Sequence, residues 1–167
     1  MNRQYTAESY WETVEKIVAK MPEITFSTDV IVGFPGETDE EFNMTRELMN
    51  RVSFDNAFIF KYSPRPGTKS AELEDSVPQE VKEERNQILL ADLAARAKKH
   101  SAALVGTMQK ILVEGVSKRN AERWTGRTDG NRTVNFLPRE DVKIGDIITL
   151  KITRAGAVSL YGEYPDL

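Results

Sequence analysis

Apolar residues follow two different patterns along the chain, and the change between them lies near residue 106. Up to that point, stretches with apolar residues at helical spacing alternate with short runs rich in β-branched and aromatic residues. This order is typical of parallel strands joined by crossover helices. Two strands are too few for a parallel sheet covered on both faces, so either partner strands are missing or this part belongs to a larger α/β barrel. The expected elements are helices at residues 6–21, 38–52 and 76–104 and strands at residues 24–32 and 54–62.

Each expected helix begins with a residue that can cap its N-terminus. Thr6 is followed by an acidic first turn, and Thr38 precedes three acidic residues in the manner of a capping box. Ser76 and Gln79 form a further potential capping box at the start of the third helix.

After residue 106, short β-type segments are separated by turn signals, among them Asp129-Gly130, which is typical of a hairpin. This pattern predicts a small closed or half-closed β-barrel of the OB type. The expected fold class is therefore α/β followed by all-β, with domains at residues 1–104 and 107–165. The expected strands lie at residues 108–114, 124–127, 132–136, 147–154 and 158–163.

Composition excludes several kinds of chemistry. The chain of 167 residues has no cysteine and a single histidine, His100. The lack of cysteine excludes disulfides, thiol nucleophiles, zinc–thiolate sites and cysteine-ligated iron–sulfur clusters within this chain. Because there is only one histidine, a Ser-His-Asp triad is nearly excluded as well. No apolar run approaches the length of a membrane span, and residues 1–12 contain no apolar signal region, so neither a membrane partner nor secretion is expected.

Charge is unevenly distributed between the two parts. Residues 1–106 carry 13 basic and 18 acidic residues, a net of −5, whereas residues 107–167 carry 10 and 8, a net of +2. Within residues 117–132, five basic residues stand against two acidic ones. This imbalance suggests that the second part binds an anionic partner.

Two loops of the first part are candidate binding segments. Thr28 and Asp29 lie inside an expected strand that leads through Gly33–Thr38 into a helix, an arrangement in which α/β folds bind ligands. The alternative is a tight left-handed turn in which Thr38 only caps the helix. The loop 62–68 also follows a strand, and its two prolines restrict Arg65; a proline-braced turn with a solvated arginine is the equal alternative.

The basic segment 117–136 has the composition of an RNA-binding surface, because cationic side chains neutralise phosphates and aromatic rings stack on bases. Trp124 and Phe136 are the candidate stacking residues, although at least one of them is expected in the core, and Asn131 and Asn135 are candidates for reading base edges. The alternative is a solvated loop. The candidate phosphate-binding residues are Lys118, Arg119, Arg123, Arg127 and Arg132.

Taken together and in order, six segments resemble the carboxyl-terminal part of the radical-SAM methylthiotransferases, in particular the branch that modifies adenosine in tRNA. The segments are MNRQYT, STDVIVGFPGETDEEF, FIFKYSPRPGT, DSVPQEVKEER, ILVEGVSKRN and TGRTDGNRTVNF. The resemblance implies the last part of a radical-SAM α/β barrel, which is TIM-like, followed by a five-stranded RNA-binding TRAM domain.

The resemblance also implies an activity and its cofactors. The family adds a 2-methylthio group to N(6)-isopentenyladenosine beside the anticodon, in the cytoplasm, using S-adenosylmethionine and two 4Fe-4S clusters. It implies that S-adenosylmethionine lies near Thr28, Asp29, Gly33, Phe34, Pro35, Glu37, Tyr62, Ser63 and Arg65. It implies that the tRNA anticodon arm meets Arg3, Tyr5, Lys118, Arg119, Arg123, Arg127, Asn131, Arg132 and Phe136.

The missing cysteines separate this chain from a complete enzyme of that family. We expect no catalytic residue, metal ligand or bound cofactor in this chain alone, no turnover, and a partner in the missing N-terminal part of the same protein. Sister enzymes acting on threonylcarbamoyladenosine in tRNA or on a ribosomal protein are alternatives, as is a stand-alone RNA-binding module.

Overall fold

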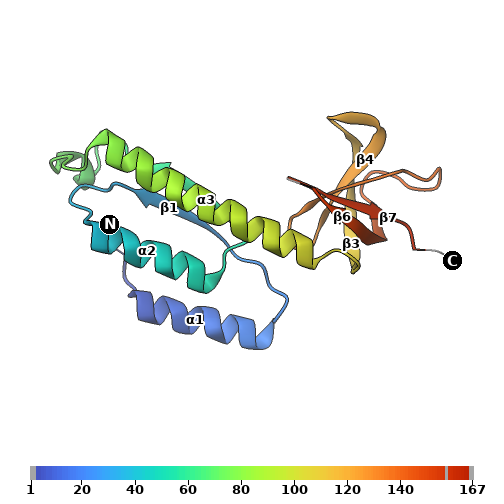
Figure 1. The fold of residues 1–167 in the computed structure, drawn as a ribbon, viewed down its shortest axis with the longest axis horizontal. Helices are drawn as coiled ribbons and strands as arrows, with labels where there is room; N and C mark the ends of the chain where they lie inside the picture. Colours follow the sequence, from blue (N-terminus) through green and yellow to red (C-terminus); the bar gives the residue numbers. More distant parts are fainter. Residues whose placement is uncertain (1–2, 157, 166–167) are drawn as a thin grey trace. The chain divides into compact units, whose positions relative to one another are not determined.

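The computed structural model describes residues 3–156 and 158–165 of the chain, which divides into two compact units, Met1–Ala97 and Lys98–Leu167 (Figure 1). The first unit contains helices and two strands, and the second is built mainly of strands. The expected succession of a mixed α/β part and an all-β part is confirmed. In the first unit the elements are α1 (Ala7–Lys20), β1 (Ser27–Val32), α2 (Asp39–Val52), β2 (Asn56–Lys61), a short 3-10 helix (Lys69–Glu72) and α3 (Gln79–Ala103), which runs on into the second unit.

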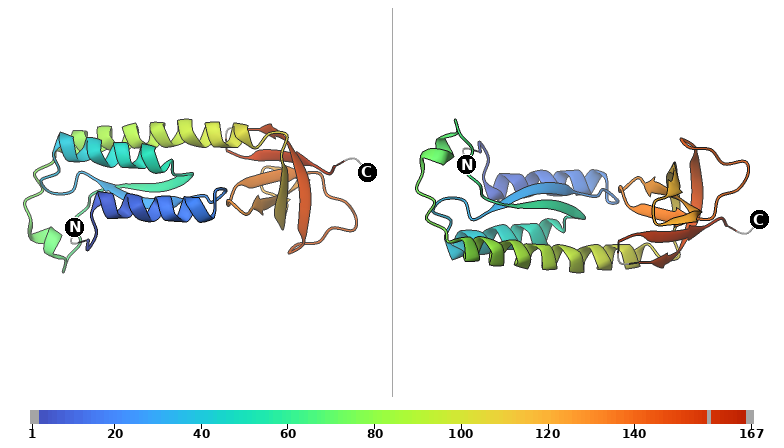
Figure 2. Two further views of the ribbon diagram at one scale, coloured as in Figure 1. Left: turned by 90° about the horizontal axis from the view of Figure 1, so that it is seen from below. Right: turned by 90° about the horizontal axis from the view of Figure 1, so that it is seen from above.

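Strands β1 and β2 form a two-stranded parallel sheet in which Asp29 pairs with Phe58, and Figure 2 shows them side by side. One face of this sheet is packed into the core, because Val30 and Ile59 contact a buried cluster to which helix residues such as Leu89 contribute. The opposite face carries Asp29 and two exposed rings, Phe58 and Phe60, which are 59% and 52% accessible. The helices therefore cover one face of the sheet and leave an apolar face open.

Hydrogen bonds at the helix N-termini explain where α1 and α2 begin. Thr38 and Glu41 form the expected capping box, and Thr6 forms another with Ser9. The capping box expected at Ser76 is not formed. The Ser76 hydroxyl instead accepts a hydrogen bond from the backbone N–H of Gly36 at 3.0 Å, and α3 begins only at Gln79.

The second unit is a closed barrel with strand order β3-β4-β5-β7-β6. Neighbouring strands are antiparallel except for β5 and β7, which are parallel. A bulge interrupts β6 between Ile152 and Arg154. Its strands are β3 (Met108–Ser117), β4 (Asn120–Thr128), β5 (Thr133–Phe136), β6 (Ile147–Ala155) and β7 (Leu160–Glu163).

The barrel interior is filled by apolar side chains that are at most 1% accessible, among them Ile111, Phe136 and Ile152. Gly126 lies where β4 approaches β3 closely, since a Cβ there would come within 2.4 Å of the Leu112 carbonyl oxygen. The β3–β4 hairpin is longer than expected, because the polar stretch that follows Val116 still pairs across the hairpin, with Ser117 opposite Asn120. Strand prediction relies on the spacing of apolar residues, so it misses a strand segment that consists of polar residues on an exposed hairpin.

An ion pair joins α2 to α3 and makes the stability of the first unit depend on pH. Arg46 donates from Nε to Asp92 at 2.6 Å and from a terminal nitrogen at 3.1 Å. These hydrogen bonds and the positive charge of Arg46 hold the pKa of Asp92 below its ordinary value. The Asp92 carboxylate therefore stabilises the fold above its unfolded-state pKa of about 3.9, and this stabilisation is lost as the pH falls through the lower folded-state value.

We expect Asp92→Asn to lower the free energy of unfolding by about 1.5 kcal/mol at neutral pH, because it weakens charge-assisted hydrogen bonds. The difference from the wild type should shrink as the pH is lowered below about 4. Urea unfolding at several pH values measures this difference in the free energy of unfolding. Glu47→Gln, a change at an exposed residue, is the control. A difference that stays constant down to acidic pH would contradict the assigned ion pair.

Candidate functional site

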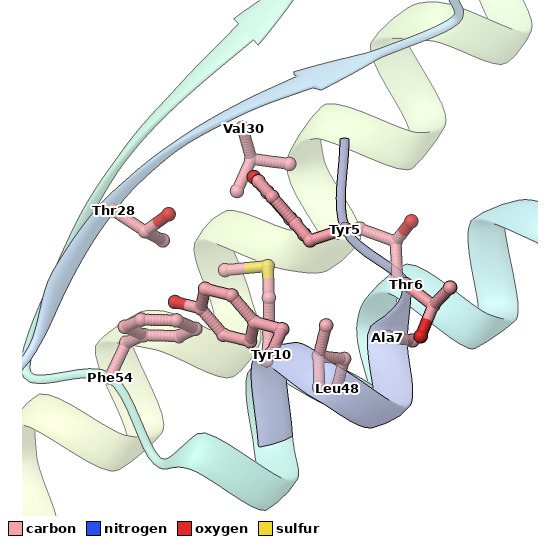
Figure 3. Close-up of a pocket in the computed structure, with 10 residues that line it drawn as sticks. Tyr5, Thr6, Ala7, Tyr10, Thr28, Val30, Leu48 and Phe54 are labelled. Carbon is pink, nitrogen blue, oxygen red and sulfur yellow. The ribbon is translucent and has the colours of Figure 1, made fainter. Parts of the chain in front are cut away.

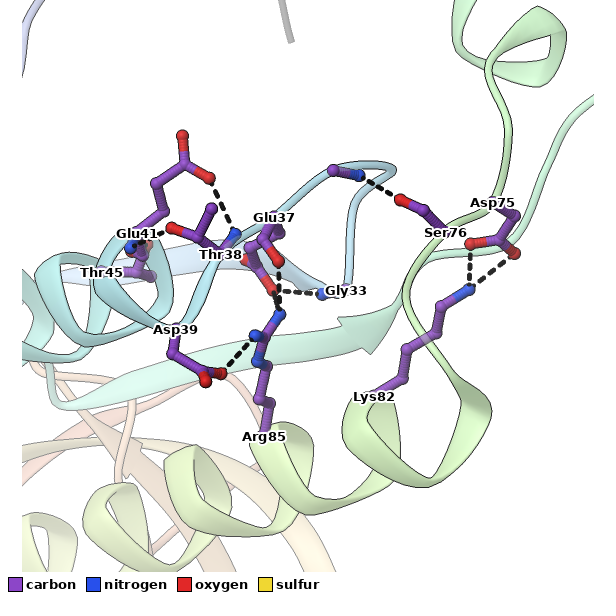
Figure 4. Close-up of polar contacts among 11 residues, drawn as sticks. Gly33, Glu37, Thr38, Asp39, Glu41, Thr45, Asp75, Ser76, Lys82 and Arg85 are labelled. Atoms are coloured by element: carbon purple, nitrogen blue, oxygen red, sulfur yellow. Dashed lines mark hydrogen bonds and ion pairs between the residues drawn. The ribbon is translucent and has the colours of Figure 1, made fainter.

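The loop after β1 is held in shape by buried polar contacts. Gly33 has a φ of +69°, and its backbone N–H donates to Glu37 Oε2 at 2.7 Å (Figure 4). A Cβ at Gly33 would lie 2.3 Å from Lys82 Cγ, so both the backbone conformation and the contact with α3 require glycine. The loop is therefore fixed against the first turns of α3.

Arg85 of α3 reaches the same loop and pairs with two carboxylates. It donates to Glu37 Oε2 at 2.6 Å, to the Glu37 carbonyl oxygen at 3.1 Å and to Asp39 Oδ1 at 2.7 Å. The Arg85 and Glu37 side chains are only 6% and 11% accessible. Burial opposes the charge of Arg85, but the hydrogen bonds to Asp39 and Glu37 outweigh it and raise the pKa of Arg85.

A second buried cation, Lys82, ties α3 to the segment after β2. Its Nζ contacts both carboxylate oxygens of Asp75, at 2.6 and 2.7 Å, and lies 5.4 Å from the centre of the Tyr62 ring. Tyr62 donates its hydroxyl to the Ser70 carbonyl oxygen at 2.8 Å and packs edge-on against Phe34. Two cations one turn apart on α3 thus order the loops that follow both strands.

The candidate cofactor residues fall into two groups in this geometry. Glu37 and Tyr62 are used in contacts within the chain, as is the backbone of Gly33. Asp29, Ser63 and Arg65 are exposed, and among the described residues their side chains make no hydrogen bond or ion pair. Phe34 and Pro35 are half-buried in the loop after β1.

Thr28 lies on the opposite face of β1 from Asp29, because successive strand residues point to opposite faces. Its side chain lines a pocket of about 260 Å³ together with Val30, Phe54, Tyr5 and Tyr10 (Figure 3). Thr28 and Asp29 therefore do not line one cavity.

Tyr5, a candidate RNA contact, borders the same pocket. Its side chain is 55% accessible, and its ring centre lies 5.9 Å from that of Tyr10. Arg3, the other candidate RNA contact near the N-terminus, is exposed.

The residues that the structure describes contain no set of side chains that could bind a metal ion. Within residues 3–156 and 158–165, no three His, Cys, Asp or Glu side chains gather as metal ligands. The complete sequence has no cysteine, so a thiolate-bound cluster has no ligand in this chain. The residues present therefore do not fit an iron–sulfur cluster.

On the barrel, two of the candidate RNA-binding arginines have partners within the protein. Arg127 donates to Glu114 Oε1 at 2.8 Å and to Asn131 Oδ1 at 2.9 Å. Arg132 donates to the Ser101 hydroxyl at 3.0 Å. The positive charge of Arg127 is therefore partly neutralised at the surface.

The remaining basic candidates lie on or near the β3–β4 hairpin. Lys118 and Arg119 are exposed in its turn, and Arg123 is half-buried on the outer face of β4. These side chains present positive charge to the solvent.

The expectation that Phe136 contacts RNA is wrong, because Phe136 is a core residue of the barrel. Its side chain is 0% accessible and belongs to the barrel core, because the strand alternation of β5 turns it inward. Trp124, its partner across β4 and β5, is half-buried against the same core. The Phe136 ring is therefore not available for stacking on a base, in line with the expectation that at least one of the two rings would be core.

The sequence pattern missed an aromatic residue on the outer surface. Tyr161 of β7 has the guanidinium carbon of Arg154 3.7 Å from its ring centre and that of Arg123 5.7 Å away. Arg154 and Tyr161 lie outside the basic segment in sequence. Only the pairing of β6 with β7 brings them together.

No helix within the described residues is long and apolar enough to span a membrane.

Comparisons with known proteins agree with this division of the chain. Residues 102–164 match the TRAM domain family. Over 98% of its length, the chain is 50% identical to a tRNA-2-methylthio-N(6)-dimethylallyladenosine synthase of Opitutus terrae and covers 34% of that protein. Proteins of the same name from Delftia acidovorans and Coxiella burnetii are 48% and 46% identical over 98% of the chain, which covers 37% of each.

The chain thus spans about a third of the length of these relatives. Residues 102–164 are thus similar to TRAM domains, and the sequence is similar, over nearly its whole length, to part of the tRNA-2-methylthio-N(6)-dimethylallyladenosine synthases.

Proposed function

We propose that this chain is the RNA-binding and cofactor-loop portion of a tRNA methylthiotransferase, whose TRAM barrel holds the anticodon arm of tRNA. The observation that carries the proposal is the closed barrel matched to the TRAM family, with exposed Lys118, Arg119 and Arg127. Basic side chains on a small barrel suit a phosphate backbone. The name of the relatives supports tRNA as the RNA and a dimethylallyladenosine as the modified nucleoside.

The first unit would contribute part of a radical-SAM barrel. Asp29, Ser63 and Arg65 are exposed polar residues on or beside the parallel strands, and they suit the polar groups of S-adenosylmethionine. Gly33, Phe34 and Pro35 would form the adjoining wall, and Glu37 and Tyr62 would act by holding the loops. Thr28 lies on the opposite face of β1 and lines the other pocket, so it would not contact the same ligand as Asp29.

Bound S-adenosylmethionine and clusters would supply the radical chemistry of the intact enzyme. Since this chain has no cysteine, the thiolate ligands would come from sequence outside it, and the chain by itself would not turn over. The remaining two-thirds of the enzyme would be its protein partner, and the place of action would be the cytoplasm, where tRNA is modified.

RNA binding is testable by titrating an anticodon stem–loop with the full chain at several salt concentrations. The logarithm of the association constant should fall with the logarithm of salt, by about 0.7 for each single-stranded phosphate neutralised. Arg127→Ala should weaken binding, whereas Glu114→Gln should strengthen it, because it releases Arg127 from its ion pair.

Lys20→Ala is the matched control, since it removes one exposed charge from α1 in the first unit. A salt slope of zero for the wild type would reject phosphate binding. Equal effects of Arg127→Ala and Lys20→Ala would mean that only the net charge of the chain matters.

A further inference from the structure

The outer surface of the barrel carries a stacked arginine–tyrosine pair. Arg154 of β6 lies over the ring of Tyr161 on the neighbouring strand, with 3.7 Å between the guanidinium carbon and the ring centre. Arg123 of β4 approaches the same ring to 5.7 Å. Asn135, on β5 between β4 and β7, is directly opposite Tyr161 in the sheet. The side chains of Arg154, Tyr161 and Arg123 thus place two planar cations beside one aromatic ring on the barrel surface.

A bulge in β6 is the reason that Arg154 is on this surface. In a regular strand Arg154 would share the inward face with Ile152, which is 0% accessible. The register of β6 against β7 shifts between these two residues, so Arg154 is exposed and lies opposite Tyr161. Bulges of this kind redirect a side chain and often lie at functional sites.

The cations of this cluster have no carboxylate in an ion pair with them in the part of the chain that the structure describes. Among the described residues, neither Arg123 nor Arg154 forms an ion pair, whereas Arg127 is paired with Glu114. A guanidinium stacked on an aromatic ring keeps its outer plane and its N–H groups for another partner. Single-stranded RNA offers both a base plane for stacking and a phosphate for the cation.

We propose that Arg154, supported by Tyr161, is a stacking platform for one unpaired nucleobase of bound RNA, and that Arg123 binds the phosphate next to it. This inference rests on the proposed RNA binding and names the site that performs it. Tyr161 acts as a positioning residue, because it holds the guanidinium that meets the base.

The test uses the full chain and an anticodon stem–loop whose unpaired loop carries 2-aminopurine, a base with fluorescence that falls on stacking. Arg154→Lys keeps the charge but removes the planar group. We expect about tenfold weaker binding, a smaller loss of fluorescence and an unchanged salt slope. Tyr161→Leu should reduce the fluorescence change in the same way, and Tyr161→Phe should retain the wild-type value.

Arg139→Lys is the matched control, since Arg139 also lies over a tyrosine, 3.9 Å from the ring centre of Tyr164. It should leave both readouts unchanged. Wild-type affinity and fluorescence in Arg154→Lys, or equal losses in Arg139→Lys, would overturn the platform while RNA binding stands. Failure of the wild-type chain to bind the stem–loop would overturn the proposed function and this inference with it.

Discussion

Phe136→Ala should lower the stability of the barrel by about 3–5 kcal/mol, the usual cost of removing a buried phenylalanine side chain. Phe136 is 0% accessible, and its ring packs edge-on against Tyr164. Because the closed barrel leaves little room to collapse, the cavity would remain in the core. The same substitution at a surface stacking residue would leave stability almost unchanged.

Trp124 offers a signal for this measurement, since it packs against the barrel core while the other tryptophan, Trp11, lies in the first unit. Urea unfolding followed by fluorescence in a Trp11→Phe background would report on the barrel. Leu137→Ala is the control at the neighbouring position, where the side chain is 56% accessible, and should change stability by less than about 0.5 kcal/mol. An unchanged midpoint for Phe136→Ala together with weaker RNA binding would restore Phe136 as an RNA contact.

Arg85→Ala should destabilise the first unit by about 3–5 kcal/mol, because it leaves the buried carboxylate of Glu37 without its cation. Asp39, the other partner, is 90% accessible and would be solvated instead. The loss should also loosen the loop after β1, since Glu37 accepts the Gly33 N–H. Trp11 fluorescence in a Trp124→Phe background would follow unfolding of this unit.

A double variant separates a buried unpaired charge from a general loss of packing. Arg85→Met combined with Glu37→Gln should cost less than Arg85→Ala, because no unpaired charge stays buried. Lys61→Ala is the surface control, since Lys61 and its partner Glu83 are 39% and 55% accessible and the pair should contribute at most about 1 kcal/mol. Equal effects of Arg85→Ala and Lys61→Ala would contradict the buried ion pair.

Local sequence signals were sufficient for most secondary structure. The capping box at Thr38, the left-handed turn at Gly33 and the hairpin at Asp129-Gly130 all depend on residues close together in the chain. The alternation of apolar residues likewise indicates which strand residues face a core. Such short-range rules do not tell whether Ser76 caps its own helix or binds a loop 40 residues away.

The amino-acid sequence by itself determined the order of elements, a small β-barrel after an α/β part, the absence of thiolate ligands and the resemblance to methylthiotransferases. Only the tertiary structure decided which charged and aromatic side chains are available to a partner. Closure of the barrel buries Phe136, while the bulge in β6 turns Arg154 outward onto Tyr161. The physical reason is that burial and pairing depend on contacts between strands distant in sequence, which charge and apolar patterns along one segment do not contain.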